Sequence, residues 1–459
     1  MNVQITSTTI CKTITTEENE NDFYQKVAQV IADIQTSDSV FISCPYGTAE
    51  YCITPRSGTF FVREASNNIN FSDKGNYPPV YLVCVNADKN NYKFYKLEQK
   101  GNDVIATYGR IGVAAGEMFG ERTYTYPSRM FWIKYHEKLA KGYQDKTDVY
   151  LNKPQKTTPT QKKTQQPDTI SDILYQKLAQ CSRQIIQENC VSEIVTEKMV
   201  KESKKILKAM YERKTVKGFN TKLLELLAIS PRKTNDVKQL LAVSAAQFPN
   251  IIQREENLIS AMEGIAGKQA ETGGFEKSGI EVYLATDKQK EQVLAKLTPN
   301  LAAKVKNVYR VINQKHKKTF DLYLKKENIH TVKQFWHGSR NENWLSIIMN
   351  GLSLRPNAVI TGKMFGNGIY FAPSCEKSWN YTSYRGTYWA KGTSNNAYMG
   401  LYATAYGSPL DVYNAHSYSQ NTLQGKNCVH AHAGTQLRND EIVFYAEDAM
   451  VLNYIVEFE

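Results

Sequence analysis

The last third of the chain contains polar residues whose types and order fit chemistry on a sugar that carries an aromatic base. His337–Ser339 is a short polar run, and Tyr370 and Tyr381 follow it. Two converging tyrosine rings can hold a flat heteroaromatic ring, because such stacking contributes about 0.5–1.5 kcal/mol per pair. Glu441 comes late in the chain, and a fixed carboxylate stabilises the positive charge that develops on a sugar when its base leaves. A single tyrosine in a chain with 29 tyrosines is more often a core residue, so neither tyrosine indicates a site by itself.

A predicted strand must position the first tyrosine. Asn367–Gly368 lies between apolar residues, and this dipeptide is typical of a tight hairpin turn, since both residues tolerate positive φ. Ile369–Phe371 then leaves the turn as a strand. Because side chains alternate across a strand, Tyr370 should face away from its two apolar neighbours and point into a cleft.

Two neighbouring carboxylates, Asp440 and Glu441, compete for the role of the late acid. Sequence neighbours on a strand point to opposite faces, so only one of them can enter the site. We expect Glu441 to enter it, on grounds of spacing given below.

Four motifs together resemble the catalytic domain of poly(ADP-ribose) polymerases, which are diphtheria-toxin-like ADP-ribosyltransferases. The resemblance covers residues 278–459 and implies an antiparallel-sheet domain that uses NAD⁺ as co-substrate. Counting without gaps from Glu441 to Tyr454 reproduces the family's spacing, whereas starting from Asp440 shifts it by one residue. The matching segments are His337–Arg340, Thr361–Ala372, Lys377–Tyr381 and the strand that opens with Glu441.

The resemblance implies a nicotinamide pocket. Gly338 should bind the carboxamide through its backbone, where a glycine allows close approach. Ser378 should offer the same amide its hydroxyl, and Tyr370 and Tyr381 should stack on the ring.

The resemblance also implies the adenosine side and the catalytic group. His337 and Ser339 should hold the adenosine part of NAD⁺, with the histidine bonded to a ribose hydroxyl. Glu441 should bond the ribose 2′-hydroxyl and face the developing charge, and Lys377 should lie beside this carboxylate or else be a surface lysine. The combination of His337, Tyr370 and Glu441 is associated with polymer-forming members, although some members that have the glutamate add single units.

One segment departs from the family's pattern. Many relatives carry an arginine after the Gly-Leu pair, where this chain has Ser353. Arg355 lies on the same side of an extended segment and is expected to replace it. The donor loop, about Arg355 to Phe365, is also slightly shorter, which leaves the choice of acceptor open.

A second resemblance covers residues 76–151. Three strands are predicted at Val80–Val85, Tyr92–Leu97 and Val104–Gly112, before a helix at Met130–Leu139. The segment is similar to a WGR domain with Tyr108 in place of the tryptophan. This implies binding of DNA or RNA ends, with Arg110 on a phosphate and Tyr108 stacked on a sugar or base. The alternative is an ordinary strand and turn.

The remaining segments complete a multidomain α+β organisation. Residues 152–167 are rich in lysine and proline and predict a flexible linker. Residues 168–277 repeat apolar side chains at helical spacing. By position they resemble the helical regulatory domain of DNA-dependent polymerases, in which the helices restrict NAD⁺ entry until nucleic acid binds. Residues 1–75 predict a small α/β module of unknown role.

Composition indicates a chain without a membrane segment. At 459 residues and 41% hydrophobic content it is long enough for three or four domains. No apolar run approaches the roughly 20 residues of a membrane span, and Met1–Gln4 opens no signal peptide. We expect a nuclear location in a eukaryote or a cytoplasmic one in a prokaryote.

Charge is uneven along the chain. Residues 1–75 contain 5 basic and 9 acidic side chains, whereas the whole chain has a net charge of +12. The positive middle and end suit nucleic-acid binding, although lysine runs are often only solvated faces.

The eight cysteines show no CxxC pair, so no zinc finger or disulfide scaffold is predicted. The tightest cluster is Cys428–His432, whose alternating side chains can share one strand face. No fourth ligand is evident in the sequence, and we expect no metal there.

The sequence therefore predicts an NAD⁺-dependent protein ADP-ribosyltransferase, polymer-forming and stimulated by DNA or RNA ends, which modifies protein acceptors including itself. One alternative is a mono-ADP-ribosyltransferase of a protein or nucleic acid. Another is a nucleic-acid-binding adaptor without catalysis.

Overall fold

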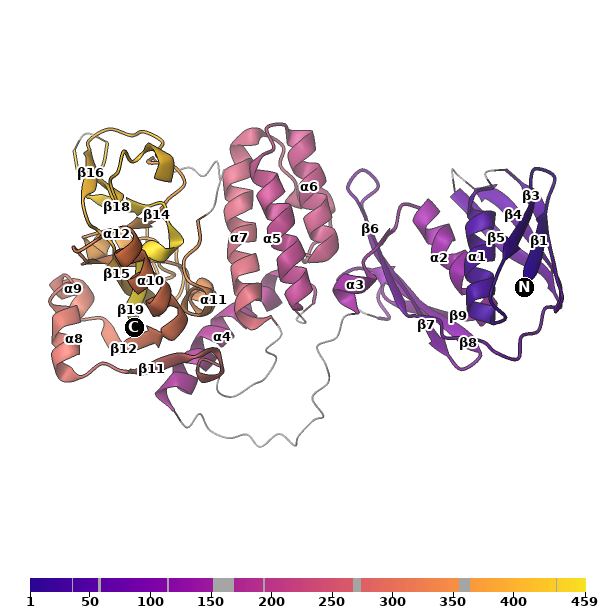
Figure 1. Ribbon diagram of the computed structural model, residues 1–459, viewed down its shortest axis with the longest axis horizontal. Coiled ribbons are helices and arrows are strands. Elements are labelled where there is room, and N and C mark those ends of the chain that lie inside the picture. Colours follow the sequence, from indigo (N-terminus) through magenta and orange to yellow (C-terminus); the bar gives the residue numbers. More distant parts are fainter. Residues whose placement is uncertain are drawn as a thin grey trace. The chain divides into compact units, whose positions relative to one another are not determined.

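The computed structural model describes residues 1–34, 36–56, 59–113, 115–151, 169–192, 195–266, 274–354, 364–434 and 436–459. The chain forms two compact units. The first consists of Met1–Pro154 and Leu224–Leu241, and the second of Gln155–Leu223 and Ala242–Glu459. Both units contain helices and β-sheets (Figure 1), so the predicted multidomain α+β class is confirmed.

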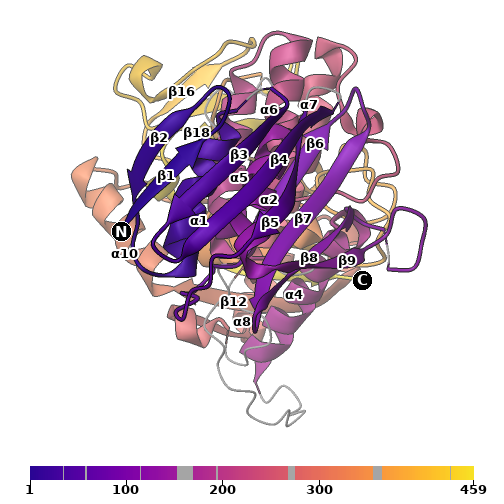
Figure 2. The ribbon, with the colours of Figure 1, turned by 90° about the vertical axis from the view of Figure 1, so that its right-hand side faces the viewer.

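The first unit opens with an antiparallel sheet of strand order β2-β1-β3-β4-β5, which is seen face-on in Figure 2. The helix α1 (Glu20–Ala32) begins at Asn19, whose side chain accepts a hydrogen bond from the backbone N–H of Asp22. Its apolar face, which includes Phe23 and Val27, is buried. The strands are β1 (Asn2–Thr6), β2 (Cys11–Thr15), β3 (Asp38–Cys44), β4 (Gly47–Arg56) and β5 (Thr59–Asn67).

A second antiparallel sheet, of order β10-β6-β7-β8-β9, follows in the same unit. The three strands and the helix predicted for this segment are present, and α2 (Phe131–Ala140) is the helix. The strands are β6 (Val80–Asn86), β7 (Asn91–Lys100), β8 (Asp103–Arg110), β9 (Arg122–Pro127) and β10 (Gln144–Asp145), with α3 (Thr147–Tyr150) after them.

Both sheets of the first unit share one hydrophobic core. Buried residues of the first sheet and α1 form a single cluster with buried residues of the second sheet and α2. Between the two helices, the indole N–H of Trp132 donates to the Asn21 side chain at 2.8 Å. Residues 1–75 and 76–151, which the sequence separates into two modules, are therefore packed together.

Four helices precede the last domain: α4 (Ile170–Asn189), α5 (Glu197–Tyr211), α6 (Val216–Ile229) and α7 (Phe248–Ile265). Threonine side chains cap the first two, because Thr169 and Thr196 accept from backbone N–H groups of the first turn. Helix α7 packs against α4 and α5 (Figure 1), and the Phe219 ring stacks on Phe248 with centroids 4.0 Å apart. Helices are thus present where apolar spacing predicts them.

The last domain contains two sheets. The larger is antiparallel, with the order β11-β12-β19-β15-β13. It consists of β11 (Ile280–Leu284), β12 (Val305–Asn313), β13 (Lys333–Gly338), β15 (Ala397–Thr404) and β19 (Met450–Phe458). The smaller has the order β14-β18-β17-β16, with β14 (Ile369–Phe371), β16 (Pro409–Val412), β17 (Cys428–Ala431) and β18 (Glu441–Phe444).

The two sheets are joined through their edges. Trp336 of β13 and Ala372, which follows β14, exchange backbone hydrogen bonds of 2.9 and 3.0 Å. The prediction of an antiparallel-sheet domain needs one correction, because β16 and β17 are parallel. The short helices around the sheets are α8 (Asp287–Leu294), α9 (Pro299–Ala302), α10 (Gln314–Lys326), α11 (Trp344–Asn350) and α12 (Cys375–Trp379).

The predicted hairpin turn at Asn367–Gly368 is wrong. The residue with positive φ is Gly366 (φ +86°), and β14 pairs with the distant β18. Gly368 is needed for a different reason: a Cβ there would lie 2.2 Å from a methyl group of Val443. Close packing against β18, rather than a tight turn, therefore explains this glycine.

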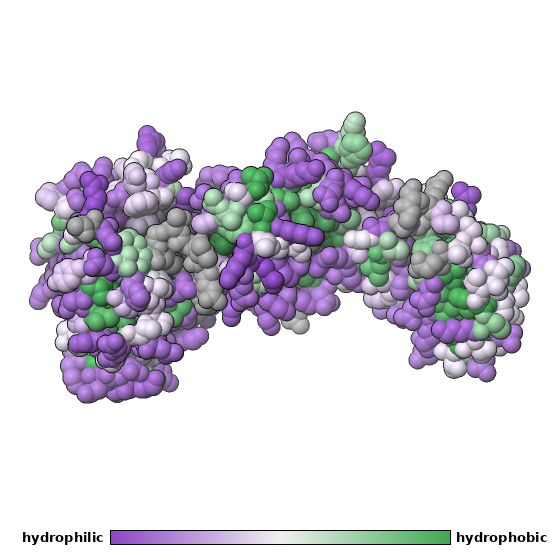
Figure 3. All heavy atoms as spheres, turned by 90° about the horizontal axis from the view of Figure 1, so that it is seen from above, coloured by the Kyte–Doolittle hydropathy of each residue, from purple (hydrophilic) through white to green (hydrophobic). Residues whose placement is uncertain are grey.

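On the face drawn in Figure 3, hydrophilic residues predominate over hydrophobic ones. None of the helices in the described ranges is long and apolar enough to cross a membrane.

Candidate active site

The predicted site residues come from the end of β13, from β14, from α12 and from the start of β18. The end of β13 packs tightly against α12. A Cβ at Gly338 would lie 1.8 Å from the backbone oxygen of Ser378, so no side chain fits at this position. Packing of β13 against α12 therefore requires glycine at position 338.

His337 is held in a fixed orientation. Its Nδ1 lies 3.0 Å from the backbone oxygen of Tyr370, and since a carbonyl only accepts, Nδ1 carries the hydrogen. The ring also contacts the aromatic rings of Trp344, Phe371 and Tyr402. In the neutral ring, Nε2 is then the acceptor.

Tyr370 fixes the turn before its own strand. Its hydroxyl donates to the backbone oxygen of Gly366 at 2.8 Å and accepts from the N–H of Phe365 at 3.1 Å. Burial raises the pKa of Tyr370, and the nearby charge of Glu441 raises it further. The side chain is half-buried while its two strand neighbours are buried, which agrees with the predicted alternation.

Tyr381 lies just after α12 and is 42% exposed. Partial burial and the charge of Glu441 raise its pKa to about 12. The charge of Glu441 contributes to the raised pKa of both tyrosines. The strand that carries Tyr370 also pairs with β18, which begins at Glu441.

Ser378 and Ser339 each have a partner within the protein. The buried Ser378 hydroxyl donates to the backbone oxygen of Trp336 at 2.9 Å, so what remains for a carboxamide N–H is its oxygen lone pairs. The Ser339 hydroxyl accepts from the side-chain amide of Asn343 at 3.1 Å.

Glu441 is buried at the start of β18, with 9% of its side chain exposed. One carboxylate oxygen, Oε1, lies 2.7 Å from the Lys377 ammonium, which also donates to the backbone oxygen of Asn439. The other oxygen, Oε2, is buried and has no hydrogen-bond partner among the described residues. Leaving an acceptor buried and unsatisfied costs about 1–3 kcal/mol, and a ligand hydroxyl would remove this cost.

Asp440 has different partners. Its Oδ2 lies 2.9 Å from Nε2 of His430, and its Oδ1 accepts from the backbone N–H of Ala433. The two neighbouring carboxylates therefore serve different groups, as strand alternation predicts.

Arg110 and Tyr108, the predicted nucleic-acid contacts, have partners within the first unit. The Arg110 guanidinium donates to the backbone oxygens of Asn90 (2.8 Å) and Asn235 (2.9 Å). The Tyr108 ring stacks on Tyr95 with centroids 5.8 Å apart. In this conformation Arg110 ties the second sheet to residues 224–241.

Sequence reasoning missed the contacts between the helices and the site. Asn343 donates both to Ser339 and, at 3.2 Å, to Asn257 of α7. Ser182 of α4 donates to the backbone oxygen of Glu342 at 3.0 Å. No local sequence pattern predicts the Asn343–Asn257 and Ser182–Glu342 contacts, because their members are 86 and 160 residues apart.

Two predicted features lie outside the described residues: Arg355 with most of the donor loop, and the linker at 152–167. Just before that loop, the backbone N–H of Leu354 donates to the Glu447 carboxylate at 2.7 Å. Ser353 is exposed.

Comparison with known proteins adds two family matches. Residues 280–458 match the poly(ADP-ribose) polymerase catalytic domain, and residues 79–149 match the WGR domain. Poly [ADP-ribose] polymerase 2 of Homo sapiens is 38% identical over 103 residues, which are 22% of this chain and 17% of that protein.

Two further relatives cover different shares. Putative poly [ADP-ribose] polymerase-like 100L of Invertebrate iridescent virus 6 is 28% identical over 159 residues, 32% of this chain and 83% of the viral protein. Poly [ADP-ribose] polymerase of Sarcophaga peregrina is 24% identical over 358 residues, 66% of this chain and 35% of the insect protein. The chain thus spans less than a fifth of the human relative and most of the viral one.

Proposed function

Since the chain carries a poly(ADP-ribose) polymerase catalytic domain at residues 280–458 and a WGR domain at residues 79–149, we propose that it is an NAD⁺-dependent protein ADP-ribosyltransferase. The observation that carries the proposal is the Glu441 carboxylate. One of its oxygens is fixed by Lys377, and the other is buried without a partner in the described part of the chain.

The nicotinamide end of NAD⁺ binds between Tyr370 and Tyr381 in this proposal. The backbone of Gly338 binds the carboxamide, supported by the close packing of β13 on α12. The lone pairs of Ser378 accept from the amide N–H, because its own hydrogen is already donated to Trp336. His337 and Ser339 bind the adenosine side, and Nε2 of His337 accepts from a ribose hydroxyl.

Glu441 performs the catalytic step. Its Oε2 accepts a hydrogen bond from the ribose 2′-hydroxyl, so the carboxylate is placed before positive charge develops on the sugar. A charge that is already oriented costs no reorganisation when nicotinamide leaves. The low exposure of the carboxylate strengthens this interaction, since little water screens it.

The combination of His337, Tyr370 and Glu441 supports polymer formation on protein acceptors, including the chain itself. The same carboxylate can orient the hydroxyl of an incoming ADP-ribose unit, which chain elongation requires. A mono-ADP-ribosyltransferase uses the same nicotinamide pocket, so the product must be measured.

Labelled NAD⁺ tests the activity. The full chain is incubated with labelled NAD⁺, with and without nicked DNA or an RNA duplex end, and separated on a gel. A ladder indicates polymer, one shifted band indicates single-unit transfer, and absence of label contradicts the proposal. Glu441→Gln should lose most of the label. Glu376→Gln is the matched control, because this exposed carboxylate lies on α12 beside Lys377.

We further propose that nucleic acid ends stimulate the enzyme. The WGR match supports binding of such ends, and the link from Ser339 through Asn343 to Asn257 supports control by the helices. NAD⁺ turnover of the full chain is compared with that of residues 278–459. Equal rates without nucleic acid would contradict autoinhibition. In the full chain, Asn257→Ala should raise the rate without nucleic acid, because it cuts the link to Ser339.

A further inference from the structure

A second group of polar side chains lies in the smaller sheet, away from the tyrosines of the candidate active site. It consists of Asp411 on β16, His430 on β17, His432 just after β17, and Asp440 just before β18. Asp411 and His430 are in register in the parallel pair, and the N–H of His432 continues the pairing to the backbone oxygen of Val412. Because side chains two residues apart point the same way, both histidines share a face with Asp411.

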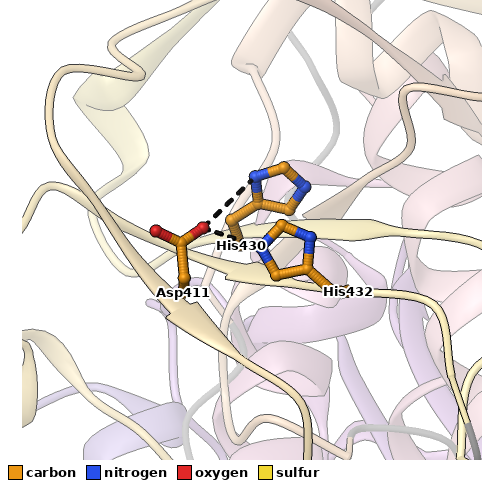
Figure 4. Close-up of side chains that lie close together, drawn as sticks. All are labelled: Asp411, His430 and His432. Atoms are coloured by element: carbon orange, nitrogen blue, oxygen red, sulfur yellow. Dashed lines mark hydrogen bonds and ion pairs between the residues drawn. The ribbon is translucent and has the colours of Figure 1, made fainter.

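The three side chains converge (Figure 4). Oδ1 of Asp411 lies 2.7 Å from Nε2 of His432 and 3.8 Å from Nδ1 of His430. One ligand atom from each residue lies within 4.8 Å of the others. Tetrahedral bonds of about 2.0–2.2 Å to one ion place the ligand atoms roughly 3.3–3.6 Å apart. The half-exposed Asp411 would therefore rotate away from Nε2 of His432, and the ring nitrogens would move closer together.

Asp440 orients the His430 ring. Its Oδ2 lies 2.9 Å from Nε2 of His430 and 3.7 Å from Nδ1 of His432. A carboxylate only accepts, so Nε2 of His430 carries the hydrogen and its Nδ1 has the lone pair. The Tyr406 hydroxyl, 2.8 Å from that Nδ1, is consistent with this assignment because it can donate. That lone pair therefore accepts from Tyr406, and an ion bound to Nδ1 would replace this hydrogen bond. By the same rule Nε2 of His432, 2.7 Å from Asp411, carries a hydrogen, which an ion would displace.

For His430 this arrangement is the one found around histidine metal ligands, in which a carboxylate accepts from the ring nitrogen that does not bind the ion. The two aspartates also bring negative charge to the cluster, which favours a cation. Without an ion, the same side chains form only hydrogen bonds and ion pairs among themselves. That is the competing explanation.

We propose that Asp411, His430 and His432 bind one divalent transition-metal ion of the zinc class, with Asp440 as a positioning residue. Two imidazole nitrogens and one carboxylate oxygen are a ligand set that such ions prefer. The remaining coordination position faces solvent, because Asp411 is 54% exposed at its side chain. The ion would fix β16 and β17 to the segment that leads into Glu441. The sequence prediction of no metal rests on the lack of a fourth ligand and did not consider Asp411 and Asp440, which lie 19 residues before His430 and 8 residues after His432.

Zinc binding to the metal-free full chain tests the proposal. The chain is freed of metal by chelation and titrated with Zn²⁺ in a calorimeter. We expect one ion per chain, and loss of this site in both His432→Gln and Asp411→Asn. His416→Gln is the matched control, because this exposed histidine contacts Tyr418 and lies outside the cluster. Binding that both variants retain would overturn the proposal.

Two further measurements keep the test independent of folding defects and of the eight free cysteines. Asp411→Asn changes an exposed side chain, and circular dichroism checks that it folds. Co²⁺ in place of Zn²⁺ should give visible bands without the charge-transfer band of a thiolate ligand. A thiolate band would place the ion on cysteine and contradict the proposed site.

The positioning role of Asp440 has its own test. Asp440→Asn keeps the three ligands but weakens the acceptor for the ring N–H of His430. We expect one ion per chain still to bind, with about 10–100-fold lower affinity. An unchanged affinity would show that Asp440 does not position His430.

Discussion

Two buried glutamates of the last domain, Glu441 and Glu457, differ in how completely their oxygens are paired. Each lies beside a lysine ammonium, at 2.7 Å from Lys377 and 2.6 Å from Lys177 respectively. The second oxygen of Glu457 also accepts from Asn307 and Tyr309, at 2.8 and 2.7 Å. The second oxygen of Glu441 is without a partner in the part of the chain that the structure describes.

The difference separates structure from ligand binding. A fully paired carboxylate stabilises the fold, because its charge is compensated and its lone pairs are used. A buried carboxylate oxygen without a partner lowers stability, and it is retained where a ligand supplies the missing hydrogen bond. Glu457 also joins α4 to the large sheet, since Lys177 belongs to that helix.

Glu441→Gln should have the largest effect of the changes considered. We expect the rate of labelled NAD⁺ transfer to fall by about 10²–10³-fold, because one pre-oriented charge is lost from the transition state. The free energy of unfolding should change little, since the substitution removes a buried charge with an incomplete set of partners. A variant that transfers ADP-ribose at the normal rate would contradict the proposed role.

Glu457→Gln should show the opposite pattern. It removes a charge that three groups use, and hydrogen bonds to charged groups contribute about 1.5–3 kcal/mol each. We expect the free energy of unfolding, measured in urea, to fall by about 2 kcal/mol. Transfer of labelled ADP-ribose, measured under conditions where the variant is folded, should remain within about twofold. A loss of transfer activity without a loss of stability would contradict the assignment of Glu457 to structure and of Glu441 to catalysis.

The sequence predicts the role of Glu441 but not that of Glu457. Glu441 is identifiable because the family's spacing from Glu441 to Tyr454 distinguishes it from Asp440. Glu457 sits in an apolar strand, and its lysine is 280 residues away, so no local spacing connects them. The same limit applies to Asp411 and His430, which are 19 positions apart with a loop and a short helical turn between their strands.

Local turn chemistry was a poor guide near Tyr370. Asn367–Gly368 has the composition of a hairpin turn, but packing of Gly368 against Val443 decides its conformation. Elements with strong periodicity, such as α4 and the strands β6 to β8, were predictable because burial of one face determines them. The shared core of residues 1–75 and the following sheet was not, because it depends on how two amphipathic surfaces meet.

Lys177→Met should have a smaller effect than Glu457→Gln. The lysine side chain is 35% exposed, so water screens much of its attraction for the carboxylate. Asn307 and Tyr309 still bond to Glu457 in the variant. We expect the free energy of unfolding to fall by about 1 kcal/mol in urea. A loss as large as that of Glu457→Gln would mean that the ion pair, and not the hydrogen bonds, dominates.

Lowering the pH should have the smallest of these effects on the free energy of unfolding. Burial alone would raise the pKa of Glu457, but the hydrogen bonds from Asn307, Lys177 and Tyr309 outweigh it and lower the pKa. A carboxyl whose pKa is lower in the folded state contributes stability above its unfolded value, about 4.3. That contribution is lost as the pH falls below this value and through the folded pKa.

The wild type and Glu457→Gln should therefore converge in acid. Unfolding in urea is measured from pH 7 down to about pH 3, and the difference in free energy between the two proteins should shrink only below about pH 4.3. The glutamine cannot ionise, so its own curve lacks this component, while all other titrating groups are common to both proteins. A difference that stays constant to pH 3 would show that the charge of Glu457 contributes nothing to the free energy of unfolding. The hydrogen-bond geometry at Glu457 would then account for the whole difference. In that case the contrast with Glu441 would rest on the unpaired oxygen alone.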